Sequence, residues 1–113
     1  MSVSKPVFTV RSDSTGALVL SGELDLATIQ ELQDKIDEIM VPGQPIVLDL
    51  ADLTFLDTSA MHCLVRTFEA TGRQVVLLNA SRALRRILGY MTQDPEAWVF
   101  DGKETDGFVG TPA

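Results

Sequence analysis

Cysteine and histidine are almost absent from this sequence, which contains one of each, Cys63 and His62. A single cysteine cannot form an internal disulfide, and one histidine with one cysteine cannot build a common metal cluster. His62 lies one residue off an apolar helical stripe, so we expect a surface side chain and not a general base. Glycine-rich phosphate loops are also missing, since Gly72 and Gly89 stand alone. The sequence therefore predicts no metal site, no cofactor and no enzymatic activity.

Basic residues and long apolar runs are also scarce. Nine Lys and Arg residues stand against 16 Asp and Glu, which gives a net charge of −7. This acidic balance argues against binding to nucleic acid, because proteins that bind nucleic acid show a basic face. It also argues against binding to anionic lipid. No apolar run approaches the roughly 18 residues of a membrane-spanning helix, and residues 1–6 lack the apolar segment of a signal peptide. We therefore expect a cytoplasmic protein that neither binds nucleic acid nor inserts into a membrane.

The rest of the sequence alternates strand and helix patterns, as expected of a single α/β domain of 113 residues. Strands are predicted at 6–12, 17–21, 46–50, 74–79 and 97–100, and helices at about 26–40, 61–70 and 82–88. The first two strands should form a hairpin, and the others a mainly parallel sheet with right-handed crossovers. Glycine and proline recur in residues 101–113, so we expect a loosely attached tail after a core of about residues 7–100.

Asp57, Thr58 and Ser59 stand where strand 46–50 and its loop lead into the central helix. Ser, Thr and Asp are the preferred helix caps, so capping alone could explain them. Asp25 has the same structural role at the preceding helix. Both acids, however, follow parallel strands, whose carboxyl ends meet at one rim of an open sheet. Two carboxylates near a threonine hydroxyl favour a function in addition to capping.

Two stretches carry a family resemblance. Gly22-Glu23-Leu24-Asp25, and the segment Ile46 to Ala60 with its Leu-Asp-Thr-Ser-Ala end, resemble the STAS domain. The family includes the bacterial anti-sigma factor antagonists, and the resemblance covers about residues 7–100. It implies a small sheet of four or five strands, mostly parallel, with an N-terminal hairpin and packed helices.

The resemblance also implies the functional residues. In the switching members, a cognate anti-sigma factor kinase phosphorylates the first hydroxyl residue after the motif aspartate, which is Thr58 here. Asp57 is then the motif acid, Ser59 the capping neighbour, and Asp25 the acid of the neighbouring loop. The surface expected to bind the partner is formed by Asp25, Asp57, Thr58, Ser59, Ala60 and His62.

The function implied is transcription regulation in a stress response by partner switching. The chain would bind an anti-sigma factor with serine/threonine kinase activity, free a sigma factor, and be switched off by phosphorylation until a phosphatase reactivates it. Two alternatives remain: a non-cycling scaffold subunit of a stressosome-like or lipid-transport complex, and a small-molecule or nucleotide binder that uses the same rim. A homodimer is also left open.

Three features depart from the family pattern. Ala60 stands where glycine is common, the acceptor Thr58 replaces a frequent serine, and no C-terminal helix is evident after Phe100.

Overall fold

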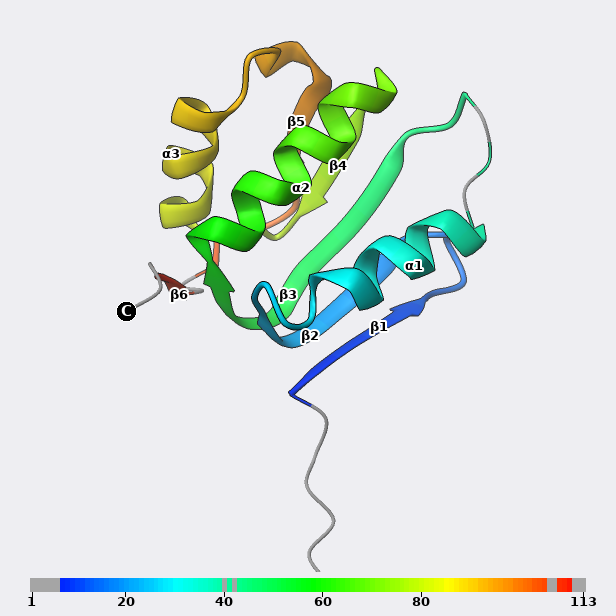
Figure 1. The fold of residues 1–113 in the computed structure, drawn as a ribbon, viewed down its shortest axis with the longest axis horizontal. Helices are drawn as coiled ribbons and strands as arrows, with labels where there is room; N and C mark the ends of the chain where they lie inside the picture. The colour runs from blue at the N-terminus through cyan, green and yellow to red at the C-terminus, as the bar shows by residue number, and fades with distance from the viewer. Residues whose placement is uncertain (1–6, 40, 42, 106–107, 111–113) are drawn as a thin grey trace, which may run out of the picture.

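The computed structural model describes residues 7–39, 41, 43–105 and 108–110 as one α/β domain (Figure 1). Strands and helices alternate along most of the chain. The strands are β1 (Phe8–Ser12), β2 (Leu18–Leu24), β3 (Ile46–Asp57), β4 (Val75–Leu78), β5 (Trp98–Asp101) and β6 (Phe108–Gly110). The helices are α1 (Ile29–Ile39), α2 (Thr58–Thr71), α3 (Arg82–Met91) and a short 3₁₀ turn, η1 (Pro95–Ala97).

The strands lie in the order β1-β2-β3-β4-β5. β1 is antiparallel to β2, and every other pair in the sheet is parallel. This confirms the predicted fold, a mostly parallel sheet that opens with a hairpin. Beyond the four or five strands expected, β6 adds a short parallel pairing with the end of β3.

All three helices cover the same face of the sheet. Because consecutive parallel strands are also neighbours in space, each right-handed crossover places its helix on that one side. Figure 1 shows α1, α2 and α3 together in front of the strands. The buried residues of α1 are Ile29, Leu32 and Ile36. Met40, the last residue of the helix predicted at 26–40, lies outside the described residues.

One apolar core fills the space between the helices and this face. Alternate strand residues point into it, as the period of two in a strand requires. Its centre consists of Leu18, Leu20 and Leu24 of β2, Ile46, Leu48, Leu50, Leu53 and Leu56 of β3, Val75 and Leu77 of β4, and Met61, Leu64, Val65 and Phe68 of α2.

Strand β3 is longer than the sequence pattern predicted. It continues to Asp57, so no loop separates it from α2. Its pairing with β2 shifts register twice, and each shift adds one residue to β3. Such bulges let a strand continue after its alternation is interrupted, and the exposed residues Ala51 and Asp52 mark the interruption. The predicted strand ended at Leu50 because this break in alternation resembles a loop.

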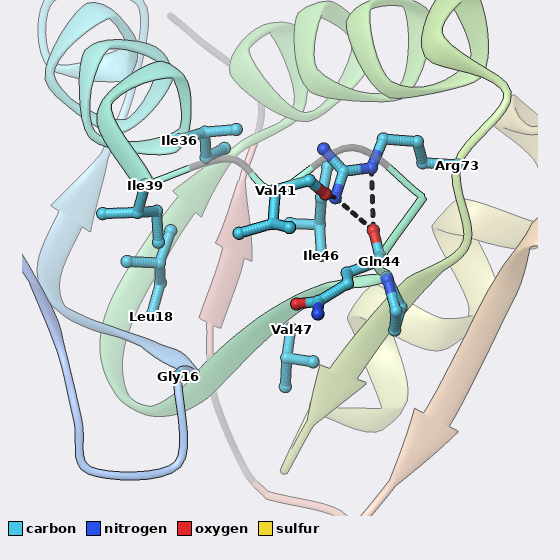
Figure 2. Close-up of a pocket in the computed structure, with 10 residues that line it drawn as sticks. Gly16, Leu18, Ile36, Ile39, Val41, Gln44, Ile46, Val47 and Arg73 are labelled. Carbon is cyan, nitrogen blue, oxygen red and sulfur yellow. Dashed lines mark hydrogen bonds between the residues drawn. The ribbon is translucent and has the colours of Figure 1, made fainter.

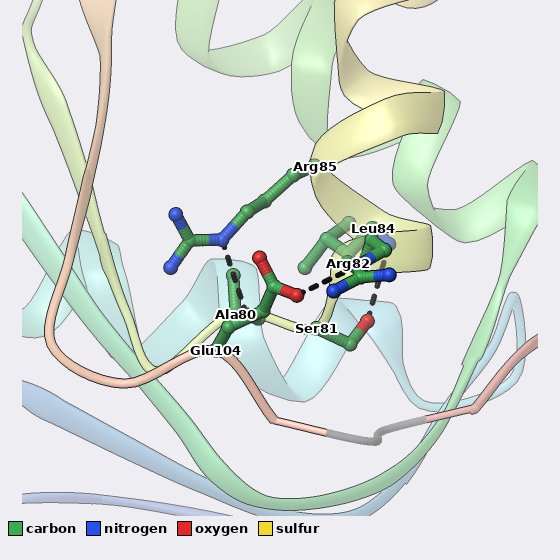
Figure 3. A network of polar contacts seen from close by, with 6 residues as sticks. All are labelled: Ala80, Ser81, Arg82, Leu84, Arg85 and Glu104. Atoms are coloured by element: carbon green, nitrogen blue, oxygen red, sulfur yellow. Dashed lines mark hydrogen bonds and ion pairs between the residues drawn. The ribbon is translucent and has the colours of Figure 1, made fainter.

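The C-terminal segment also differs from the loosely attached tail that was expected. Asn79 Oδ1 accepts a hydrogen bond from the Lys103 amide (2.9 Å), and the Asn79 carbonyl accepts one from the Thr105 hydroxyl (2.9 Å). Arg82 Nε lies 2.8 Å from Glu104 Oε1 (Figure 3). These anchors are polar, so the apolar periodicity gave no sign of them. Residues 106, 107 and 111–113 of the predicted tail lie outside the described residues.

Glu69, near the end of α2, binds the turn that follows α3. Its Oε2 accepts hydrogen bonds from Thr92 Oγ1 (2.6 Å), the Gln93 amide (3.0 Å) and the Asp94 amide (2.9 Å). Partial burial of the carboxylate raises its pKa, but the hydrogen bonds from Thr92 and the two amides more than offset this. The pKa of Glu69 is therefore held below its ordinary value.

Glu69 should make stability depend on acid pH. Because its folded pKa lies below the ordinary value of 4.5, its contribution is complete above that pH and is lost as the pH falls through the folded pKa. We expect Glu69→Gln to lower the unfolding free energy at neutral pH by about 1–3 kcal/mol and to flatten its fall in acid. Urea unfolding across the acid range measures both. Thr92→Val should act in the same direction to a smaller extent, and unchanged acid slopes in both variants would contradict this role.

Candidate functional site

Asp57 is the cap of α2. Its backbone is extended (φ −74°, ψ 132°), and its Oδ1 accepts a hydrogen bond from the Ser59 amide at 3.1 Å. The side chain is 6% exposed. Ser59 thus donates its amide to the cap and is not itself the cap, in contrast to the role that the resemblance implied. Thr58 is the first residue of the helix and is half-buried.

The turn before α1 lies beside this helix start. Leu24 of β2 is the register partner of Leu56 of β3, so Asp25, directly after β2, and Asp57, the last residue of β3, stand at the same level. Figure 1 shows this turn next to the junction of β3 and α2. The two acids therefore stand on one rim of the sheet, as the order of the strands predicted.

Asp25 holds the turn through its carboxylate. Oδ1 accepts hydrogen bonds from the amides of Ala27 (2.9 Å) and Thr28 (3.0 Å), and the Thr28 hydroxyl donates to Glu23 O (3.1 Å). The Asp25 amide in turn donates to Thr28 Oγ1 (3.0 Å), a reciprocal arrangement like a capping box. The fixed turn presents Leu26, which is 58% exposed. Sequence analysis did not single out Leu26, since one leucine outside the apolar stripe carries no pattern.

The first turn of α2 divides into an outer and an inner side. His62 is exposed and Ser59 is half-buried, whereas Ala60 is fully buried (0% exposed). A small residue at position 60 therefore serves packing against the core. We define the α2 rim as Asp25, Leu26, Thr58, Ser59 and His62. Asp57 and Ala60, also predicted to contact a partner, lie beneath this surface and support it.

Strand β6 forms the third side of the site. Its backbone pairs with β3 so that Gly110 is the register partner of Asp57, the cap of α2. β6 thus lies next to the candidate phosphorylation site. Phe108 and Val109 form an apolar pattern that is too short to predict a strand, so the sequence alone did not place β6 here.

The described residues contain no group of three or more His, Cys, Asp or Glu residues that could hold a metal ion. No helix among them is long and apolar enough to span a membrane. The α2 rim presents the hydroxyl of Thr58 at the helix N-terminus, the exposed side chain of Leu26 and the carboxylate of Asp25.

A cavity of about 70 Å³ lies at the opposite end of β3, between the β1–β2 hairpin and α1 (Figure 2). Its cationic group is Arg73. The guanidinium Nε donates to the Gln44 carbonyl (2.8 Å), and Nη2 donates to the Val41 carbonyl (2.7 Å). Nη1 is buried and has no hydrogen-bond partner among the described residues. Through Nε and Nη2, Arg73 fixes the turn between α1 and β3.

Comparison with known proteins gives a family and a fold. The family model described as "STAS domain" matches residues 7–104. Among solved structures, the unphosphorylated form of the anti-sigma factor antagonist SpoIIAA is similar, with a TM-score of 0.56 and 24% sequence identity. The match covers 83% of this chain and 87% of that one. No curated protein matches the sequence.

The cap of α2 should matter more to stability than the neighbouring hydroxyl. We expect Asp57→Ala to lower the unfolding free energy by about 0.5–2 kcal/mol, the usual value of a lost cap. Thr58→Ala should cost less, because Asp57 still accepts the Ser59 amide. Ser81→Ala is the matched control, since Ser81 caps α3 through the Leu84 amide (3.1 Å), and its loss should resemble that of Asp57→Ala. Denaturant unfolding in which Thr58→Ala proved the most damaging would show that Thr58 is mainly structural.

Proposed function

Because the chain belongs to the STAS domain family, we propose that it is an anti-sigma factor antagonist that is switched off by phosphorylation of Thr58. In the active state the α2 rim binds an anti-sigma factor with serine/threonine kinase activity and releases its sigma factor. A phosphatase restores the unmodified protein. The observation that carries the proposal is the division of roles at the start of α2, where Asp57 accepts the capping hydrogen bond and Thr58 holds the first helical position.

This division makes Thr58 suitable for modification. A phosphate adds roughly −1.5 to −2 charges at neutral pH. At a helix N-terminus that charge meets N–H donors and the positive end of the helix dipole, so the domain itself can tolerate it. Modification is therefore expected to change the surface while the fold persists.

The negative charge of the phosphate has a different effect at the interface with a bound partner. The chain carries a net charge of −7, and Asp25 stands on the rim beside Thr58. The phosphate adds bulk within the contact, and its desolvation on docking opposes binding. Acidic groups of the partner that approach Thr58 would be repelled, and like charges across an interface can cost several kcal/mol.

The rim residues take distinct parts in this contact. Thr58, Ser59 and His62 present the first turn of α2 to the partner. Asp25 fixes the adjacent turn through its hydrogen bonds to Ala27 and Thr28, and so fixes the position of the contact surface. Asp57 and Ala60 act from beneath, one as the cap and the other by close packing.

Incubation with the cognate kinase and ATP should add one phosphate, on Thr58. The wild-type protein and Ser81→Ala should both be modified, because Ser81 is a buried cap on another helix. Thr58→Ala should remain unmodified. Peptide mapping by mass spectrometry identifies the position, and a phosphate found on Ser59 or Ser81 with Thr58 unmodified would refute the assignment.

Phosphorylation should weaken binding without unfolding the protein. We expect Thr58→Glu to bind the purified anti-sigma factor at least about tenfold more weakly than wild type, since one negative charge reproduces part of the effect of a phosphate. Thr58→Gln, similar in size but neutral, is the matched control and should bind more tightly than Thr58→Glu. Thr58→Ala should keep binding and resist inactivation by the kinase.

Titration calorimetry measures these affinities, and circular dichroism confirms that each variant is folded. Equal affinity of wild type, Thr58→Glu and the enzymatically phosphorylated protein would refute the switch and favour a scaffold that does not cycle phosphate.

A further inference from the structure

The face of the sheet opposite the helices carries apolar side chains that do not belong to the core. Register partners place them in two adjacent rows across the strands. None of them is part of the core cluster or packs against it. They are Val19 of β2, Val47 of β3, Val76 and Leu78 of β4, and Val99 of β5.

No described helix covers this open face, which we define by those five residues. Parallel sheets are normally covered on both faces, because their strands are rich in apolar residues on each side. Here the three crossovers all place their helices on the other face, as Figure 1 shows. Val99 is 36% exposed and Val47, Val76 and Leu78 are partly exposed, whereas Val19 is only 8% exposed and is already buried within one copy. The uncovered apolar residues of this parallel sheet favour the binding of another molecule to the open face.

The charges on this face indicate what the occupant is. One row of register partners runs Arg11, Val19, Asp49, Leu78, Asp101, from β1 to β5. The exposed cation and the exposed anion thus stand at opposite ends of the same row. A surface with this order is complementary to itself after a rotation of 180° about an axis parallel to the strands.

We propose that the open face binds a second copy of this chain through a two-fold axis parallel to β3. The rotation keeps each row at its level and exchanges the two ends of the sheet, so that Arg11 of one copy faces Asp101 of the other at both ends. Val19 then faces Leu78 of the second copy. Two sheets stacked face to face lie about 10 Å apart, a distance that these side chains can span.

This contact is separate from the proposed docking of an anti-sigma factor. The α2 rim lies at the carboxyl ends of the strands and at the helix side, whereas the dimer contact is on the opposite face. A dimer would therefore present two rims, both free to bind. The proposal stands or fails independently of any phosphorylation at Thr58.

The two-fold axis also places Asp49 of one copy opposite Asp49 of the other. Its Oδ1 is held by Asn79 Nδ2 and by the Ala51 amide, each at 3.0 Å. Two like charges at the centre oppose association, and the few apolar side chains supply limited area. The dimer is therefore weak, with dissociation in the range of about 10 µM to 1 mM.

Sedimentation equilibrium of the full chain over that concentration range tests the proposal. Wild type should show a monomer–dimer equilibrium. Arg11→Glu and Asp101→Lys should each weaken the dimer by about tenfold, because each replaces two attractions by two repulsions. The double variant restores opposite charges and should return to near the wild-type constant. Tyr90→Lys changes an exposed residue on α3 and should leave the constant unchanged.

A further variant probes the axis itself. Asp49→Asn keeps an acceptor for Asn79 and Ala51 but removes the facing charges, so the dimer should become tighter by about threefold or more. Thermal unfolding confirms that every variant is folded. A wild-type monomer at all concentrations, failure of the double variant to recover, or a weaker dimer with Asp49→Asn would each overturn the proposal.

Discussion

The order of the strands determines most of what this molecule can do. Because β2, β3, β4 and β5 are adjacent in the same sequence in which the chain makes them, every crossover turns the same way. The helices must then share one face, and the loops that follow the parallel strands must share one rim. The candidate site and the open face of the sheet are thus two results of one topological constraint.

At the rim, structural and functional roles are carried by different residues. Asp57 supplies the acceptor that the helix start requires, and Asp25 does the same for the adjacent turn. In the proposed function, Thr58 and Leu26, each next to one of these acids, contact the partner. A modification or a new contact at these positions does not have to compete with a hydrogen bond that either acid provides.

The sequence was sufficient for the elements whose burial follows a period. The apolar spacing in α2 and the run from Ile46 to Leu50 predicted the central unit and the parallel sheet correctly. It was insufficient where polar groups decide the structure. The extension of β3 depends on bulges at Ala51 and near Thr54, and the attachment of the C-terminal segment depends on Asn79 and Arg82. Such contacts join residues distant in sequence and leave no periodic trace. At the rim, the two acids were placed by strand order, but that Asp57 is the cap required the geometry.

The position of β6 affects how fusion variants of this protein should be designed. Gly110, the last residue of β6, is paired with Asp57, and three residues span at most about 10 Å when extended. A fluorescent protein or purification handle fused after Ala113 would therefore be tethered beside the α2 rim and would crowd any partner there. A fusion directly before β1 would also begin at the rim end of the sheet, because Phe8 pairs with Gly22 and the Val7 carbonyl accepts a hydrogen bond from the Glu23 amide (2.8 Å), two residues before Asp25. Binding experiments are therefore best made after any handle at either end has been removed.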